Sequence, residues 1–422
     1  MKNLLSTYIK NEYLQFKNLN NDCRRLVASN FFYSFIFLTL PIIANYFIFI
    51  EFQGLDQEQM MKYNISYFVG YFVAIPIGFA INGFLLRHFK INYLYILGMF
   101  AEIFVIVPLT FLHIKTMLPL FLIGNVMGIS SGLFWSNRHY MAFFVTDNLN
   151  RNYVFGLENA LINVGGFVTP LIFAFLTGIA GFTLTRLFPG IPPEVGKILL
   201  AAFLLTLIFI ASFVILKGNF RNPEIKPFLF FKYCKTWNKQ RWMNILEGLT
   251  NGSLIVMPSL IVLHIFKDSS ILGVLQSVGI LTGLLPVYLL GRYSKPHHRI
   301  NILAVSGCIL IVSAIIIAIG FNEISSIIFL LCAQVIFTIL YMPYLAIRMR
   351  SMNLSAPIDK REEYSYLVDI EITFGIGRIL GLGIFLLGYY YFSQNFSLRF
   401  GFLFVAVVPL IAAFLAKTIK QE

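Results

Sequence analysis

The 422-residue sequence predicts an all-α membrane protein in which twelve transmembrane helices form two pseudo-symmetric six-helix bundles. Three observations lead to this fold class. First, 58% of the residues are hydrophobic and 12% are charged, whereas a soluble domain has about 25% charged residues. Second, long apolar segments recur along the whole chain. Third, loops rich in Lys and Arg alternate with loops poor in them, as on the two sides of a membrane.

The apolar segments are long enough to cross a bilayer as helices. A hydrocarbon core of about 30 Å needs about 20 apolar residues per helix. Helices pair every backbone polar group internally, and the alternating pattern of a membrane β-strand is absent from the sequence. We therefore expect spans at residues 26–52, 63–86, 91–111, 118–144, 153–179, 197–217, 242–266, 271–290, 300–320, 326–347, 365–391 and 400–417.

Loop charge predicts the orientation of these spans. Of the 32 Lys and Arg residues, 24 fall on the side of the two termini and six fall in the loops of the other side. Because loops that stay in the cytoplasm carry an excess of Lys and Arg, we expect both termini to be cytoplasmic. The protein is then a multi-pass protein of the cytoplasmic (inner) membrane, surrounded by lipid. The net charge of +13 reflects these loops, and we expect no nucleic-acid partner.

A long basic connector lies between the sixth and seventh spans and divides the chain. We expect four parts: a segment on the cytoplasmic membrane surface, an N-terminal six-helix bundle, a cytoplasmic linker and a C-terminal six-helix bundle. These parts are residues 1–24, 25–217, 218–241 and 242–422. The halves also repeat in part, since Arg24 and Pro41 recur with the same spacing as Arg241 and Pro258.

The loop after the second span reads GFLLRHFK, with Gly83, Arg87 and Lys90. A basic pair recurs after the eighth span, at Arg292 and Lys295. Two sets of six spans, a long central linker and these short basic loops resemble the major facilitator superfamily. The signature of that superfamily also has an Asp-Arg pair in this loop, and the Asp is missing here. The resemblance implies alternating access around a central site between the halves.

Charged residues near the ends of spans predict a gate. A charge at the bilayer centre costs about 2.5–3.5 kcal/mol or more, so such residues tend to have partners. Arg138 in span four and Glu158 in span five lie at similar depth and can pair. Arg348 and Asp369 hold the corresponding places in spans ten and eleven. We expect both pairs to brace the cytoplasmic mouth, similar to the sugar porters of the superfamily; the alternatives are static pairs that only orient helices, or no pairing.

Three charges lie deeper, at Glu102 in span three, Glu247 in span seven and Arg378 in span eleven. A carboxyl group away from water can take up and release a proton near neutral pH, so Glu247 and Glu102 are the candidates for proton coupling. Arg378 is the candidate for substrate contact or charge balance. The alternative for Glu102 and Arg378 is a structural pair between helices. Glu371 lies two turns before Arg378, and we expect a bridging group or a partner on another helix rather than direct contact.

In the superfamily, spans one, four, seven and ten line the central cavity. Polar residues are few on these spans, and aromatic rings are plentiful beside them. This composition favours an amphipathic or aromatic solute over a sugar. Our further candidates for substrate contact are Asn125, Trp135, Asn251, Gln334 and Tyr341.

No nucleoside-triphosphate phosphate loop and no HExxH motif occur in the sequence, so we expect no enzyme activity, cofactor or metal site. The sequence predicts a monomeric secondary active transporter that moves a small organic solute by alternating access, coupled to protons. Two alternatives stay open. One is a flippase for lipids or amphiphiles on the same fold, and the other is a membrane sensor that transports nothing.

Overall fold

The computed structural model describes residues 12–37, 57–111, 116–147, 150–177, 193–225, 227–266 and 269–420. The regular secondary structure of these residues is helical. The helices are, in chain order, α2 (Asn21–Phe37), α4 (Gln57–Leu85), α5 (Ile91–Phe111), α6 (Met117–Val145), α7 (Arg151–Thr177), α9 (Pro193–Leu216), α10 (Lys235–Phe266), α11 (Ser269–Tyr293), the short η1 (Pro296–His298), α12 (Arg299–Gly320), α13 (Glu323–Asp359), α14 (Glu363–Tyr391), α15 (Gln394–Ala406) and α16 (Val408–Lys420).

Each predicted span overlaps one of these helices, and the all-α fold class is confirmed. Nine helices within the described ranges are long and apolar enough to cross a membrane. The last predicted span is divided into α15 and α16 at Val407. The division follows from Pro409, because proline has no N–H to donate to the carbonyl of Val405.

Two helices are longer than the sequence predicts. α10 begins at Lys235, inside the predicted linker, and α13 continues to Asp359, beyond the predicted end of its span. The two extensions support each other, since the Asp359 carboxylate accepts a hydrogen bond from the backbone N–H of Cys234 at 3.0 Å. As a result, Trp237 and Arg241 lie on a helix rather than in a loop.

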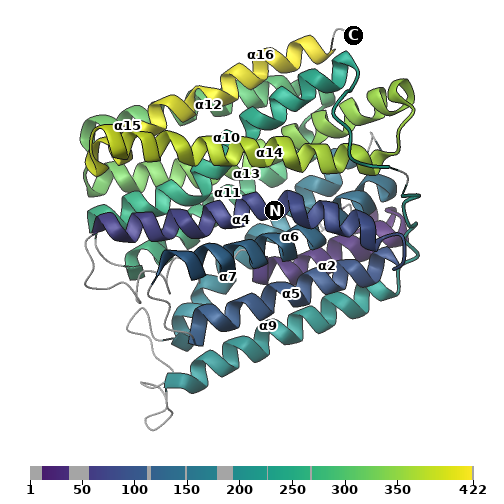
Figure 1. Cartoon of the computed structure of the whole chain (residues 1–422), viewed down its shortest axis with the longest axis horizontal. Helices are drawn as coiled ribbons and strands as arrows, with labels where there is room; N and C mark the ends of the chain where they lie inside the picture. Colours follow the sequence, from purple (N-terminus) through teal and green to yellow (C-terminus); the bar gives the residue numbers. More distant parts are fainter. Residues whose placement is uncertain are drawn as a thin grey trace, which may run out of the picture.

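The helices form two groups, which we call the N-terminal group (α2 to α9) and the C-terminal group (α10 to α16). Figure 1 shows the N-terminal group in the lower part of the bundle and the C-terminal group in the upper part. The groups meet along two seams, where α4 packs against α14 and α7 packs against α11. The exact domain boundaries predicted above stay predictions.

The α7–α11 seam depends on two glycines. A Cβ added to Gly156 would lie 2.6 Å from the Cα of Gly291, and the reverse substitution meets the same distance. Real Cβ atoms do not approach that closely, so only small residues allow the two backbones to pack here.

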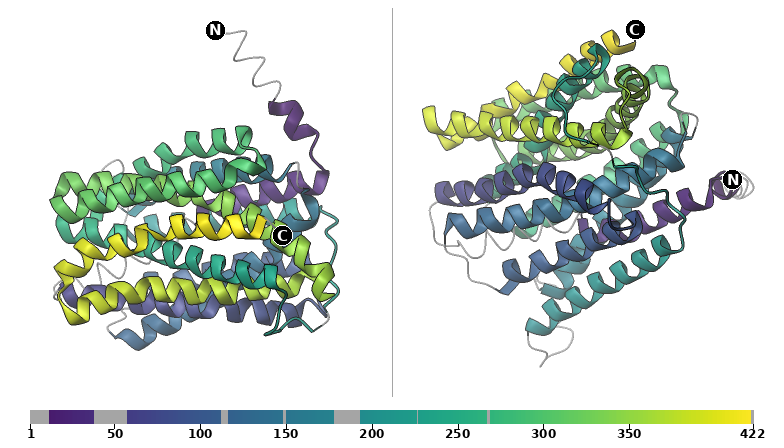
Figure 2. Two further views of the ribbon diagram at one scale, coloured as in Figure 1. Left: turned by 90° about the horizontal axis from the view of Figure 1, so that it is seen from above. Right: turned by 45° about the vertical axis from the view of Figure 1, so that its right-hand side comes forward.

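The connector between α9 and α10 lies at one end of the bundle, together with the C-terminal end of α16 (Figures 1 and 2). We call this the linker end. The last turns of α4, α6 and α11 and the first turns of α7, α12 and α14 lie there. By the loop charges above, the linker end is the one that the sequence predicts to be cytoplasmic.

Candidate functional site: a central cavity with charged walls

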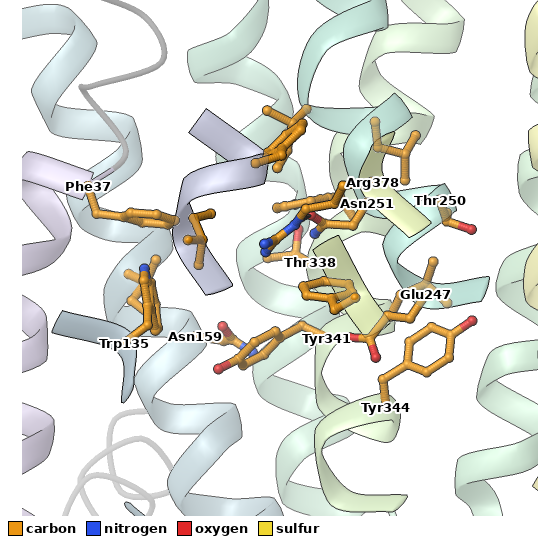
Figure 3. Close-up of a pocket in the computed structure, with 18 of the residues that line it drawn as sticks. Phe37, Trp135, Asn159, Glu247, Thr250, Asn251, Thr338, Tyr341, Tyr344 and Arg378 are labelled. Atoms are coloured by element: carbon orange, nitrogen blue, oxygen red, sulfur yellow. Dashed lines mark hydrogen bonds between the residues drawn. The ribbon is translucent and has the colours of Figure 1, made fainter. Parts of the chain in front are cut away.

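A cavity of about 190 Å³ lies between the two helix groups. α2, α4, α6 and α7 line it from the N-terminal group, and α10, α11, α13 and α14 line it from the C-terminal group. Most of its lining side chains are aromatic or aliphatic, with a few charged and amide groups among them. Figure 3 shows Phe37, Trp135 and Asn159 on one side and Asn251, Glu247 and Arg378 on the other.

Rings and two amides form the N-terminal wall. Trp135 packs edge-on against Phe37, with 5.0 Å between the ring centroids. Asn159 and Asn163 lie four residues apart on α7 and therefore share a helical face. Both are buried, and neither side-chain nitrogen has a hydrogen-bond partner among the described residues. These amides present unused donors beside the cavity.

The C-terminal wall contains a buried ion pair between Glu247 of α10 and Arg348 of α13. The guanidinium of Arg348 also lies 5.5 Å from the centre of the Phe374 ring. Both charged residues line the cavity. The carboxylate of Glu247, predicted above for proton coupling, is therefore held by an arginine at the cavity wall.

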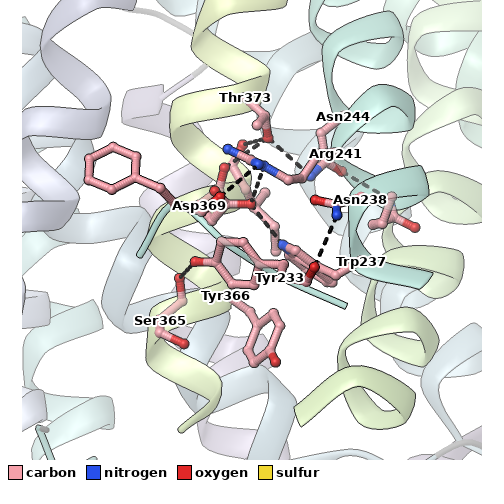
Figure 4. A network of polar contacts seen from close by, with 12 residues as sticks. Tyr233, Trp237, Asn238, Arg241, Asn244, Ser365, Tyr366, Asp369 and Thr373 are labelled. Atoms are coloured by element: carbon pink, nitrogen blue, oxygen red, sulfur yellow. Dashed lines mark hydrogen bonds and ion pairs between the residues drawn. The ribbon is translucent and has the colours of Figure 1, made fainter. Parts of the chain in front are cut away.

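This pairing corrects the predicted Arg348–Asp369 pair, which is not formed. Asp369 instead accepts a hydrogen bond from Nε1 of Trp237 at 2.7 Å and lies 3.2 Å from Nε of Arg241 (Figure 4). The reason is the early start of α10. Along α10, Trp237 and Arg241 lie one and a half turns or more before Glu247. They contact α14 there, whereas Glu247 contacts Arg348.

Arg378 lies at the other side of the same wall. Its Nη1 donates to Glu371 at 3.2 Å, and its Nε donates to the side-chain oxygen of Asn251 at 3.1 Å. The ring of Phe374 lies 3.9 Å from the guanidinium. The expectation that Glu371 and Arg378 do not touch directly is wrong, because the long arginine side chain spans two helical turns by itself. The expected partner on another helix is present as well, since Asn251 belongs to α10.

The predicted contact between Arg138 and Glu158 is present within the N-terminal group. Nε of Arg138 donates to Glu158 at 3.1 Å, and Nη2 contacts the second carboxylate oxygen. Asn30 of α2 also donates to this carboxylate. The pair ties α6 to α7, and α2 joins it through Asn30. Its role as a gate stays a prediction.

Glu102 of α5 is fully buried and does not line the cavity. Tyr33 and Ser131 both donate hydrogen bonds to its carboxylate. Glu102 and Arg378 do not pair with each other, because Arg378 bonds to Glu371 and Asn251. One link to the cavity exists: the hydroxyl of Tyr71, a lining residue, lies 3.4 Å from Oγ of Ser131.

A separate set of contacts joins the two groups at the linker end. The hydroxyl of Tyr364 on α14 donates to the carbonyl of Phe79 at 2.9 Å and accepts from Nδ2 of Asn82 at 3.1 Å. The connector residue Phe228 packs against the Tyr364 ring, with 5.8 Å between centroids. We call Tyr364 with Phe79, Asn82 and Phe228 the Tyr364 latch. It lies on the α4–α14 seam.

The α7–α11 seam has its own contacts at the same end. Nδ2 of Asn152 donates to the carbonyl of Ser294 at 3.0 Å. Nη2 of Arg299 donates to Oδ1 of Asn152 at 2.8 Å. Both seams are therefore hydrogen-bonded at the linker end.

Comparison with known sequences does not assign the chain to a family. No family model matches the chain. A curated relative, the uncharacterized protein YqgE of Bacillus subtilis (strain 168), is 22% identical over 275 residues. The match covers 64% of this chain and 61% of YqgE, so it spans less than two thirds of that relative's length.

Solved structures match nearly the whole chain. FucP, a major facilitator superfamily transporter in the outward conformation, aligns over 94% of this chain and 98% of its own, with a TM-score of 0.60 and 13% identity. A bacterial homologue of the iron transporter ferroportin, in the outward-facing state, aligns over 96% and 100%, with a TM-score of 0.63 and 13% identity. The human organic anion transporter MFSD10 aligns over 94% and 98%, with a TM-score of 0.63 and 11% identity. The chain has the major facilitator fold.

Within this major facilitator fold, four of the five further residues predicted for substrate contact lie at the cavity. They are Trp135, Asn251, Gln334 and Tyr341. The fifth, Asn125, is not among the lining residues, and its amide donates to the carbonyl of Phe121 on its own helix at 2.8 Å. It lies near the start of α6, away from the linker end.

The expectation that spans one, four, seven and ten form the lining is too narrow, because α4, α7, α11 and α14 also contribute. The residues missed in this way include Asn159 and Asn163, and Thr250 of α10 was missed although its span was expected to line the cavity. The two asparagines had a signal in the sequence. They stand four residues apart in an apolar span, the spacing that puts two polar groups on one helical face.

Proposed function

We propose that the protein is a secondary active transporter that moves a small organic solute across the cytoplasmic membrane by alternating access. The observation that carries this proposal is the position of the cavity. It lies between two helix groups that are hydrogen-bonded to each other at the linker end. A solute in the cavity reaches the linker side once these contacts break and the groups rock about it.

In this proposal the linker end faces the cytoplasm. The support is the loop charge, since 24 of 32 Lys and Arg residues fall on that side, and basic loops are retained inside. Both termini are then cytoplasmic, and the protein works as a monomer in contact with lipid. The Tyr364 latch becomes the cytoplasmic closure.

Protons drive the transport in this proposal, with Glu247 as the first site of protonation. Its carboxylate lines the cavity and holds Arg348, so protonation would weaken the pair and free the guanidinium for a solute. Glu102 is the second candidate. It has two hydroxyl donors, and a path through Ser131 and Tyr71 leads to the cavity.

The fold neighbours do not select the solute. By their printed names they handle fucose with protons, iron and organic anions. The substrate class must therefore be argued from the cavity of this chain.

Alternating access can be measured without knowing the solute. Two spin-label pairs are introduced after the four native cysteines are replaced: His88 with Ile358 at the linker end, and Met117 with Phe392 at the opposite end. All four positions are exposed. In lipid nanodiscs, pulsed dipolar spectroscopy should show two populations of molecules. In each population the distance within one label pair is long and the distance within the other pair is short. A single population for both pairs at every pH and in every lipid would refute the transporter proposal.

A further inference from the structure

The lining of the cavity has free donors. Asn159 and Asn163 are 6% and 4% exposed, and their side-chain nitrogens have no partner among the described residues. Nε of Arg348 is a third such donor, because the contact with Glu247 uses Nη2. A buried polar group without a partner destabilises the protein. A ligand that supplies acceptors would recover this free energy.

The carboxylates of the lining, by contrast, are already engaged. Glu247 accepts from Arg348, and Glu371 accepts from Arg378. The side-chain oxygen of Asn251 also accepts from Arg378. A cationic solute would have to displace an arginine from a carboxylate, whereas an acceptor group would meet, on both walls, lining residues whose buried donors have no partner among the described residues.

The remaining surface suits an apolar or aromatic body. Trp135 and Phe37 form an edge-on pair at the N-terminal wall, and Tyr341 lies between the two walls (Figure 3). Flat apolar groups pack well against such rings. A sugar has hydroxyl groups all around it and would leave many of them without partners in this lining.

A metal ion fits the site poorly. Within the described ranges, no three His, Cys, Asp or Glu side chains are placed to hold a metal ion together. The two lining carboxylates lie in separate arginine pairs. The iron that one fold neighbour's name prints therefore has no matching ligand set among these residues.

We infer that the cavity binds a small organic anion. Its apolar or aromatic body lies against Trp135 and Tyr341, and its carboxylate accepts hydrogen bonds from Asn159, Asn163 and Arg348. The inference rests on the proposed function, since it names the class of solute for the same cavity. Charge-assisted hydrogen bonds from two walls also give the anion a way to hold the groups together.

The test uses full-length protein in nanodiscs and matched pairs of probes. The acids are benzoate, phenylacetate and indole-3-acetate, and the partners are their primary amides, which keep the shape and lose the charge. Binding is measured by calorimetry and by the shift in unfolding temperature. At least one acid should bind at least about tenfold more tightly than its amide, the effect of one charge-assisted hydrogen bond. L-fucose and Fe²⁺ should not compete with it.

Variants test the donors. Asn159→Leu with Asn163→Leu keeps the size of the side chains, removes both amides, and should weaken acid binding at least about tenfold. Asn125→Leu is the matched control, since Asn125 lies outside the lining, and it should leave binding unchanged. The double variant also removes two unpartnered donors, so loss of folding is not expected.

Three results would overturn the inference: equal binding of acids and amides, unchanged acid binding by the double variant, or no binding of any acid. If the spin-label pairs still alternate in any of these cases, only the substrate class is wrong. If an acid binds but the pairs never alternate, the transporter proposal is wrong and the ligand class stands.

Discussion

Removal of one hydroxyl group from the Tyr364 latch should open the linker end. Tyr364 is buried at the α4–α14 seam and makes two hydrogen bonds to the N-terminal group, one to the carbonyl of Phe79 and one from Asn82. The substitution Tyr364→Phe keeps the ring that packs against Phe228 and removes both bonds. In a conformation with separated groups the hydroxyl would be hydrated, so its loss matters less there.

The size of the effect follows from these two bonds. A neutral hydrogen bond inside a protein contributes about 0.5–1.5 kcal/mol net to stability. Two bonds therefore stabilise the closed linker end by about 1–3 kcal/mol. Their loss should raise the ratio of open to closed molecules by about 5- to 150-fold.

The measurement is the His88–Ile358 distance distribution in nanodiscs. We expect a larger long-distance population for Tyr364→Phe than for the unchanged protein. Tyr390→Phe is the matched control, because Tyr390 is 79% exposed and can lose its hydroxyl without affecting a seam. An unchanged distribution for Tyr364→Phe would refute the idea that these bonds close the linker end.

Three further predictions concern the Glu247–Arg348 pair, the α7–α11 seam and the contact between Trp237 and Asp369. Glu247→Gln keeps an acceptor for Arg348 but cannot be ionised, so accumulation driven by a pH gradient should be lost in proteoliposomes while solute binding persists. Gly156→Val puts a side chain where a Cβ would lie 2.6 Å from Gly291, so the spin labels should report a linker end that cannot close. Trp237→Phe removes the 2.7 Å bond to the Asp369 carboxylate, and the lost charged hydrogen bond, about 1.5–3 kcal/mol, should lower the unfolding temperature.

A specific result would contradict each of these three predictions. Normal accumulation by Glu247→Gln across a pH gradient would remove Glu247 from the coupling mechanism. For Gly156→Val the control is Gly383→Ala, because an added Cβ at Gly383 has no atom within 4 Å; equal distances for both variants would contradict the seam argument. An unchanged unfolding temperature for Trp237→Phe would show that Arg241 alone holds Asp369.

The helices could be predicted from the sequence because each is a long apolar run, and a bilayer leaves the backbone of such a run no other solution. The pair of Arg138 and Glu158 was also predictable, since both residues lie inside spans and at similar depth. Depth is fixed once the two ends of a span are known. Prediction therefore succeeds where the partners belong to neighbouring spans with well-defined ends.

The partner of Arg348 could not be found in this way. α13 and α10 extend beyond the apolar runs that define them, and hydropathy gives no signal for a helix that continues beyond the bilayer. The extension of α10 brings Trp237 and Arg241 to Asp369 and leaves Arg348 to Glu247. Depth alone allows several partners for a charge, and only the rotation of each helix about its axis selects one.

The observed pairs suggest how such a structure can move. Three buried ion pairs among the described residues each lie within one group: Arg138 with Glu158 in the N-terminal group, and Glu247 with Arg348 and Glu371 with Arg378 in the C-terminal group. Breaking a buried ion pair costs about 3–5 kcal/mol when one partner is left alone. If the groups rock as rigid bodies, these pairs stay intact.

The hydrogen bonds that must break at the seams are weaker, and the ion pair between Arg292 of α11 and Glu12, which precedes α2, is partly exposed to water. At the α4–α14 seam they are the hydroxyl and amide bonds of the Tyr364 latch, each about 0.5–1.5 kcal/mol. At the α7–α11 seam they are the Asn152 and Arg299 bonds, which water can replace once the end opens. An arrangement with strong pairs inside the groups and weaker bonds between them lets the groups separate without exposing an unpaired charge to lipid. The Arg138–Glu158 pair would then hold the N-terminal group rigid and the Glu247–Arg348 and Glu371–Arg378 pairs the C-terminal group, while the seams close the passage.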